Sequence, residues 1–135
     1  MDACAGSQEG QNEMVTFQVG STSLNTANLS VNWPNNSWLG LTKNASTAAN
    51  ISTVNSTISG CGFLKEPTGG VLPANSKVLL VTSTAWTPLA QSFVNLTDTL
   101  YVIFQTAGNT AGHFANYQAG GGLRTLSMTF STPAS

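Results

Sequence analysis

Short apolar segments separated by Gly, Pro and Asn run along the whole chain, and they predict β-strands rather than helices. The segment 13–20, EMVTFQVG, alternates an apolar face with a mixed face, as a half-buried strand does. Two longer runs, SKVLLVTST at 76–84 and DTLYVIFQT at 98–106, are apolar on both faces. Because such runs are typical of strands covered on both sides, we expect these two to pair at the centre of a sheet.

Weaker patterns predict four further strands. Pro34 ends the first of them, since proline donates no backbone hydrogen bond. In the second, alternation places Trp38 on the face opposite to Leu39 and Leu41. These strands are expected at 24–33, at 37–42, around Phe114 and at 123–130.

The segment 43–63 combines Ala with many Asn, Ser and Thr residues. Its alanines would support a short helix near 47–50, whereas Asn, Ser and Thr prefer caps and turns to helix interiors. We therefore favour a loop followed by a strand at 56–64, STISGCGFL, which carries Cys61 and Phe63.

At 135 residues the chain has the length of one domain with a real core. We expect a single domain over 1–135, with its core at 12–130 and a tail or linker at 131–135. Few, brief helical patterns and turn residues at short intervals favour an all-β sandwich.

Charge is scarce: 7% of the residues are charged, 41% are hydrophobic and the formal net charge is −1. The four basic residues are too dispersed to neutralise a phosphate backbone, which argues against nucleic acid as a partner, and the same scarcity disfavours anionic membranes. No stretch approaches the roughly 18 apolar residues of a membrane span. Solubility from Ser, Thr, Asn and Gln is common in β-rich proteins outside the cell, so we expect an extracellular or cell-surface location with the signal peptide removed.

The two cysteines, Cys4 and Cys61, form an even pair in such a chain. In an oxidising compartment they would form one disulfide that ties the N-terminal segment to the middle. Two unrelated thiols are the alternative.

Catalytic chemistry finds little support in the sequence. His113 is the only histidine, it stands in a Gly- and Asn-rich segment, and no G-x-S-x-G motif accompanies it. One histidine with two distant cysteines does not provide a zinc site. Calcium is the remaining alternative, but NLTDT at 95–99 lacks the clustered acids of a high-affinity loop. We expect a non-enzymatic protein without a metal or other cofactor, and leave calcium open.

The three tryptophans raise a binding hypothesis. Indole rings stack on sugar C–H surfaces, and amide neighbours can hydrogen-bond to hydroxyl groups. Trp38 stands among leucines and is expected in the core. Trp33 and Trp86 adjoin polar segments, NWPNN and TAWTP, and are the candidate ligand-binding residues.

The order of the motifs resembles the lamin tail domain family. The resemblance covers about 12–118. Gly40 stands where the family usually has Glu, and Cys61 where it usually has Trp, which would let a bridge to Cys4 replace part of the core. The similar pieces are NEM (12–14), SWLGLTKN (37–44), TISGCGF (57–63), GVLPANSKVLLV (70–81) and FVNLTDTLYVIFQTAGNTAGHFANY (93–117).

The resemblance implies an all-β, immunoglobulin-like sandwich without catalytic residues. The variant pattern CGFLKEPTGGVLPANSKVLLVTST also resembles a bacterial surface-exposed subset of the family, in which such a domain opens a long secreted protein. The implied function is a non-catalytic extracellular structural or interaction module, for adhesion or binding, within a larger secreted or surface protein. Its partners would be other domains of that protein, a polysaccharide or a cell-surface protein. The alternative is a carbohydrate-binding module that uses exposed Trp and Asn side chains.

Overall fold

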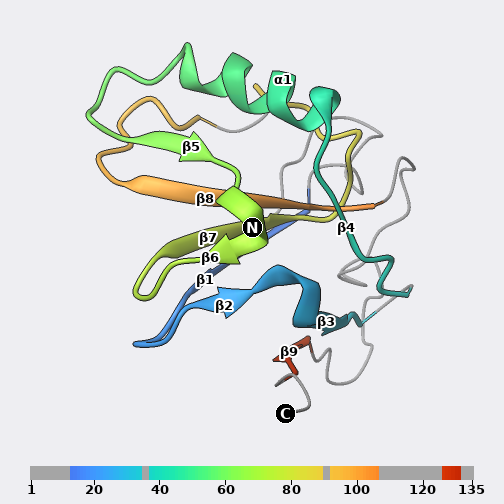
Figure 1. The fold of residues 1–135 in the computed structure, drawn as a ribbon. Helices are drawn as coiled ribbons and strands as arrows, with labels where there is room; N and C mark the ends of the chain where they lie inside the picture. The colour runs from blue at the N-terminus through green and yellow to red at the C-terminus, as the bar shows by residue number, and fades with distance from the viewer. Residues whose placement is uncertain (1–12, 35–36, 90–91, 107–125, 132–135) are drawn as a thin grey trace, which may run out of the picture.

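The structure is a computed structural model, and it describes residues 13–34, 37–89, 92–106 and 126–131 (Figure 1). This part of the chain is mostly β-strand with one short α-helix, as the apolar pattern predicts. In chain order the elements are β1 (Met14–Gln18), β2 (Leu24–Asn25), the 3-10 turn η2 (Thr26–Asn28), β3 (Leu29–Asn32), β4 (Leu41–Thr42), α1 (Ala45–Asn55), β5 (Phe63–Lys65), the 3-10 turn η3 (Thr68–Gly70), β6 (Val71–Leu72), β7 (Lys77–Val81), β8 (Thr99–Gln105) and β9 (Ser127–Phe130).

The main sheet has the strand order β1-β7-β8-β4, and β5 also pairs with β8. β1 is antiparallel to β7, while β7 and β8 are parallel, with Leu79 opposite Val102. β5 runs parallel to the start of β8, and β4 runs antiparallel to its end. The prediction that the two long apolar runs pair at the centre is therefore confirmed.

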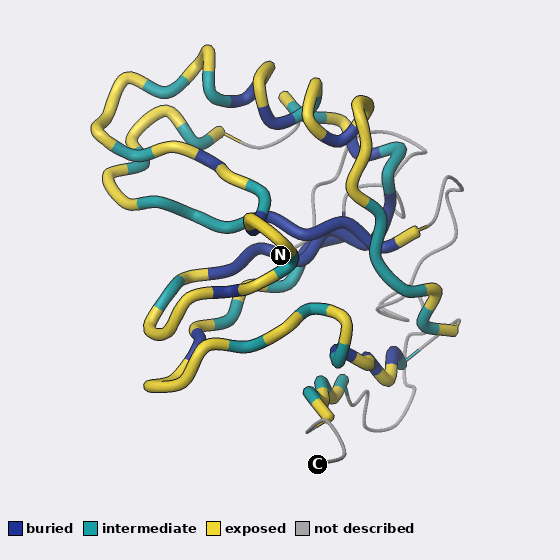
Figure 2. The backbone as a smooth tube through the Cα atoms, viewed as in Figure 1, coloured by how far each residue is buried: buried dark blue, intermediate teal, exposed yellow. Residues whose placement is uncertain are grey.

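Strand alternation divides the core into two clusters, one on each face of the main sheet. On β7, Leu79 and Val81 belong to one cluster and Val78 and Leu80 to the other, and none of the four side chains is exposed. Figure 2 shows the buried backbone concentrated in these central strands. A strand covered on both faces needs apolar side chains at every position, which explains the unbroken apolar runs.

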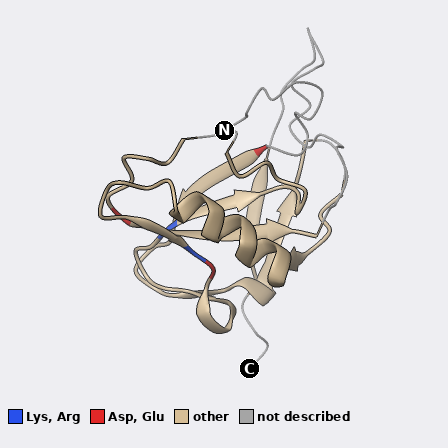
Figure 3. Ribbon diagram, turned by 90° about the horizontal axis from the view of Figure 1, so that it is seen from above, with Lys and Arg blue, Asp and Glu red and all other residues tan. Residues whose placement is uncertain are grey.

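The helix-side cluster is covered by α1. It contains Met14, Ile51, Val54, Leu64, Leu79, Val81, Trp86, Val102 and Phe104. Figure 3 shows α1 lying across this side of the sheet.

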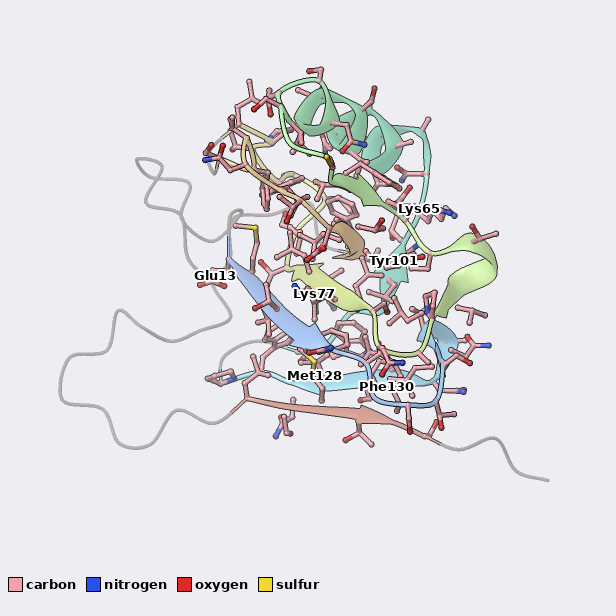
Figure 4. All side chains as sticks on the ribbon, turned by 90° about the vertical axis from the view of Figure 1, so that its left-hand side faces the viewer. Glu13, Lys65, Lys77, Tyr101, Met128 and Phe130 are labelled. Carbon is pink, nitrogen blue, oxygen red and sulfur yellow. The ribbon has the colours of Figure 1, made fainter. Side chains whose placement is uncertain are left out.

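The strand-pair-side cluster is covered by two antiparallel strand pairs, β3 with β9 and β2 with β6. Figure 4 shows β3 and β9 beside the main sheet, with Met128 and Phe130 directed towards it. The ring centroids of Phe17 and Phe130 are 6.2 Å apart. The buried members of this cluster are Val19, Leu29, Val31, Trp33, Leu72, Val78, Leu80 and Ile103.

The helix α1 contradicts the expected loop at 43–63. Asn44 caps it: its side chain accepts a hydrogen bond from the Thr47 amide, and the Thr47 hydroxyl accepts one from the Asn44 amide. This capping box satisfies backbone donors that would otherwise lack partners. Thr47, Ile51 and Val54 are buried at helical spacing. Asn44 therefore caps the helix, and most of its Asn, Ser and Thr residues lie outside the buried face, so they do not prevent it from forming.

Two predicted strands are shorter than expected. The segment 37–42 is extended only as β4, because Gly40 adopts a φ of 78° that a regular strand does not allow. Trp38 and Leu41 both pack against the strand-pair-side cluster, so the expected opposition of these two residues is wrong. The segment 56–64 contributes only Phe63 and Leu64 to β5, and Cys61 precedes that strand. The strand expected around Phe114 lies outside the described residues, and so does the beginning of the strand expected at 123–130. β9 confirms the rest of that second strand.

The outer edge of β5 is closed by one side chain. Asn55 Nδ2 donates to the Leu64 carbonyl at 3.0 Å, and the Leu64 amide donates to Asn55 Oδ1 at 2.7 Å. Asn55 thus makes the bonds that a neighbouring strand would make, which blocks unwanted pairing at this edge.

The segment before β5 lies directly on the backbone that precedes β8. A Cβ atom at Gly62 would lie 2.5 Å from the Asp98 carbonyl oxygen, so only glycine fits there.

Within the described part of the chain, no helix has the length and apolarity needed to cross a membrane.

Candidate functional site

The structure buries both tryptophans that the sequence offers as ligand-binding residues. Trp33 is 6% exposed and Trp86 is 3% exposed. The expectation of exposed indole rings at these positions is therefore wrong. Proximity to polar segments does not determine which way an indole ring points, and here both rings point into the core.

Trp33 belongs to a buried polar node on the strand-pair side. Its Nε1 donates to Gln105 Oε1 at 2.7 Å, and the Leu39 amide donates to the same oxygen at 3.4 Å. Gln105 Nε2 donates to the Thr82 carbonyl at 3.0 Å. Gln105 is fully buried, so its amide connects β8, the end of β7 and the segment before β4 through bonds that water does not share.

Trp86 lies in the helix-side cluster, where its ring centroid is 5.8 Å from that of Phe104. Its Nε1 is buried and has no hydrogen-bond partner among the described residues. Trp86 thus serves packing alone, and it retains the cost of one unmade hydrogen bond.

Trp38, which the sequence assigns to the core, is the half-buried tryptophan. It packs on Trp33 with a centroid distance of 6.5 Å, and it also lines a surface hollow. The aromatic wall of a surface site is therefore Trp38, which sequence reasoning missed.

Two adjoining hollows of about 410 Å³ and about 180 Å³ run along β4. They share Thr26, Leu41 and Gly70, so we treat them as one site, the β4 groove. The groove lies between the chain at 38–43 and the two turns η2 and η3. Its lining is Asn25, Thr26, Ala27, Leu29, Trp38, Gly40, Leu41, Thr42, Lys43, Glu66, Pro67, Gly69, Gly70, Val102, Ile103 and Phe104.

The floor of the groove lies between β5 and β4, the two strands that pair with different parts of the same edge of β8. β5 pairs with β8 as far as Tyr101, and β4 pairs with it from Phe104 onward. Pairing with the β5 chain cannot continue through Pro67, because proline has no amide hydrogen. Val102 and Ile103 therefore line a gap in the sheet edge rather than a continuous ladder.

Two hydrogen bonds made by the main chain at 39–40 hold the Trp38 wall of the groove in place. The Leu39 amide bonds to the buried Gln105, and the Thr106 amide donates to the Gly40 carbonyl at 2.8 Å. Because both residues that follow Trp38 are tied to the end of β8, the indole has a fixed base.

The opposite wall is formed by the turns η2 and η3, which are tied together. Thr26 Oγ1 donates to the Gly70 carbonyl at 2.7 Å. The Ala27 amide donates to Oδ1 of the exposed Asn25 at 2.9 Å, so the Asn25 group that remains to bind a ligand acceptor is Nδ2. Gly69 and Gly70 have φ values of 62° and 73°, a conformation that favours glycine.

Charge separates the two ends of the groove. Lys43 and Glu66 lie at one end, where Lys43 Nζ donates to the Pro67 carbonyl at 3.0 Å. At the Trp38 end, which is the larger hollow, none of the described lining residues is charged. Figure 3 shows how thinly charged residues are spread over the described ribbon.

The other two acidic residues that the structure describes, Asp98 and Glu13, lie in different surroundings. Asp98 is exposed and pairs with Lys77 at 2.9 Å. Glu13 is buried, and its carbonyl accepts a hydrogen bond from the Thr82 amide. No group of three or more His, Cys, Asp or Glu residues that could hold a metal occurs in the described segments. Asp2, Glu9 and His113 lie outside them, so the absence of a metal, with calcium left open, and the absence of a catalytic histidine stay predictions.

The expected disulfide has one end in the described structure. Cys61 is exposed, and Cys4 lies outside the described residues. The bridge between them stays a prediction.

No protein-family model, curated protein or solved structure matches this chain. The lamin tail resemblance therefore rests on the quoted sequence motifs.

Proposed function

We propose that this chain is a non-catalytic extracellular interaction module, for adhesion or binding, within a larger secreted or surface protein. The observation that carries the proposal is the β4 groove. Its walls are held by bonds to the buried Gln105 and by the bond between η2 and η3. A site fixed before its ligand arrives loses little conformational entropy on binding.

We further propose that the fold is an immunoglobulin-like β-sandwich of the lamin tail type. The support is the order of the sequence motifs together with the strand pairs β3–β9 and β2–β6 on one face of the main sheet. The helix α1 on the other face adds a layer that a plain two-sheet sandwich does not need. An experimental structure tests this: the proposal requires the strand pairs β3–β9 and β2–β6 to pack together as one layer against the main sheet, and strand pairs that do not cover this face would contradict it.

An extracellular location is supported by the charge-poor composition and by the even number of cysteines. Proteolysis of intact cells that make the protein should release its peptides, and peptide mapping without reductant should recover Cys4 joined to Cys61. Peptides found only after lysis would contradict the location. Two alkylated thiols would contradict the bridge without affecting the groove.

Carbohydrate recognition through Trp33 and Trp86 is not carried forward, since both rings are buried. Candidate partners of the module are the other domains of its parent protein, a polysaccharide or a cell-surface protein. Retention of the purified chain on one of these partners, with loss in groove variants, is the expected result. Retention that groove variants leave unchanged would contradict a role for this groove.

A further inference from the structure

We infer that the Trp38 end of the β4 groove binds a neutral saccharide. This inference rests on the proposed role as a binding module, and it names the class of ligand and the residues that contact it. Three properties of the described residues carry it: the aromatic wall, the polar atoms opposite that wall and the absence of charge between them.

The aromatic wall is Trp38. An indole combines a large apolar face with a polar N–H group, and it loses little conformational freedom on binding because it has two rotatable side-chain bonds. One side of Trp38 packs on Trp33, and another borders the larger hollow. The ring is therefore supported from behind while part of it remains available to the C–H face of a sugar.

Hydrogen-bonding groups lie across the groove from that wall. They are the amide of Asn25, the hydroxyl of Thr26 and the main chain at Gly69. The oxygen of Asn25 is already used by the Ala27 amide, so Nδ2 is the group offered to a ligand hydroxyl. At Gly69, which carries no side chain, a ligand can approach the backbone closely.

The charge distribution decides between classes of ligand. Among the described residues, the lining of the larger hollow contains no Lys, Arg, Asp or Glu, whereas Lys43 and Glu66 line the adjoining smaller hollow. A phosphorylated or acidic ligand would require cations at the site. A neutral polyol requires only amides, hydroxyls and a stacking surface.

The dimensions also fit. The larger hollow of about 410 Å³ falls in the range of about 300–1,000 Å³ that small-molecule sites occupy. The smaller hollow continues it along β4, so a chain of sugar units could extend past the first one.

Affinity electrophoresis in gels that contain galactomannan, xyloglucan, xylan or a β-1,3-glucan tests the inference with the whole chain. At least one of these neutral glycans should retard the wild-type protein. Trp38→Ala should weaken that affinity at least tenfold, since central aromatic residues dominate binding energies. Ala27→Arg should have a similar effect, because Ala27 is exposed and the larger side chain would occupy the groove without touching the core.

Two control variants and one control ligand complete the design. Leu89→Ala removes the most exposed of the large hydrophobic side chains, away from the groove, and should leave affinity unchanged. Thr22 does not line the groove but lies in a neighbouring hollow that shares Asn25 with it, and Thr22→Ala should also be silent. Polygalacturonate provides the acidic glycan. Thermal unfolding of each variant separates loss of binding from loss of fold, and Ala27→Arg keeps the test valid if Trp38→Ala unfolds.

No retardation by any neutral glycan overturns the inference. So does retardation that persists in Ala27→Arg, or retardation by polygalacturonate alone. If an immobilised cell-surface protein or peptide is bound instead, the saccharide inference fails and the interaction module stands. New reducing ends released from a bound glycan would contradict the non-catalytic function while leaving the groove in place.

Discussion

The main sheet is covered by a helix on one face and by two strand pairs on the other, and each side buries one tryptophan. On the helix side, Trp86 packs against Phe104 and its N–H group has no partner among the described residues. On the strand-pair side, Trp33 donates to the fully buried Gln105. Both rings are core residues, but only Trp33 is connected by hydrogen bonds to a surface feature.

This difference shows how a buried polar group can shape a surface site. Gln105 accepts hydrogen bonds from Trp33 and from the Leu39 amide, so the core fixes the segment that carries Trp38. On the helix side, the Trp86 N–H makes no corresponding hydrogen bond to any described residue, so the ring contributes buried area and does not orient a surface segment. The comparison predicts that a change at Gln105 affects both stability and the Trp38 wall of the groove, whereas a change at Trp86 affects stability alone.

The largest effect is expected for Gln105→Ala. This variant removes three hydrogen bonds and leaves the Trp33 N–H, the Leu39 amide and the Thr82 carbonyl without their partner. Each of the three groups left unsatisfied costs about 1–3 kcal/mol, so the free energy of unfolding should fall by about 3–9 kcal/mol. Urea denaturation measures the change. Gln18→Ala, at an exposed strand position, is the matched control and should change stability by less than about 0.5 kcal/mol.

Leu79→Ala and Leu80→Ala probe the two faces through adjacent residues of β7. Both side chains are fully buried, Leu79 in the helix-side cluster and Leu80 in the strand-pair-side cluster. Each variant should lower the free energy of unfolding by about 2–5 kcal/mol. Near-wild-type stability of either variant would show that the corresponding face is not packed as described.

Asn55→Ala tests the two hydrogen bonds that Asn55 makes with the Leu64 main chain at the edge of β5. It removes both hydrogen bonds to Leu64 and exposes the edge of β5, so we expect a loss of about 1–3 kcal/mol in denaturant unfolding. Asn55→Asp retains the acceptor but loses the Nδ2 donor, and it should recover part of that loss. Light scattering should report more self-association for Asn55→Ala, because an open strand edge favours pairing between molecules.

The smallest effect separates the two buried tryptophans. Trp33→Phe leaves Gln105 without one donor and should cost about 1–3 kcal/mol. Trp86→Phe removes a donor that lacks a partner, so its only cost is lost packing, and we expect it to be the less destabilising of the two variants. If Trp86→Phe is the more destabilising variant in thermal unfolding, the stabilising role of the hydrogen bond between Trp33 and Gln105 is contradicted.

The sequence predicts those parts of the fold that depend on local pattern. β1, β7, β8 and β9 follow from alternation and from unbroken apolar runs. The sequence does not predict the helix α1, because Asn, Ser and Thr favour caps and turns over helix interiors. The missed signals were the cap at Asn44 and the spacing of Thr47, Ile51 and Val54.

The site could not be predicted because it depends on contacts between distant segments. Trp33 and Gln105 are 72 positions apart, and Thr26 and Gly70 are 44 positions apart. Nothing in the neighbourhood of a tryptophan along the chain reveals a partner at such a distance. Trp38, which the sequence assigns to the core, packs against the core and also borders the groove, whereas the two tryptophans left open are buried.

The most direct test of the account is intrinsic fluorescence during titration with a neutral glycan that retards the protein. Trp38 is half-buried and borders the proposed site, whereas Trp33 and Trp86 are enclosed in the two clusters. We predict a shift in emission that persists in Trp33→Phe and Trp86→Phe and disappears in Trp38→Phe. A shift that persists in Trp38→Phe, or no shift with any retarding glycan, would contradict the central claim that Trp38 is the aromatic wall of a saccharide site.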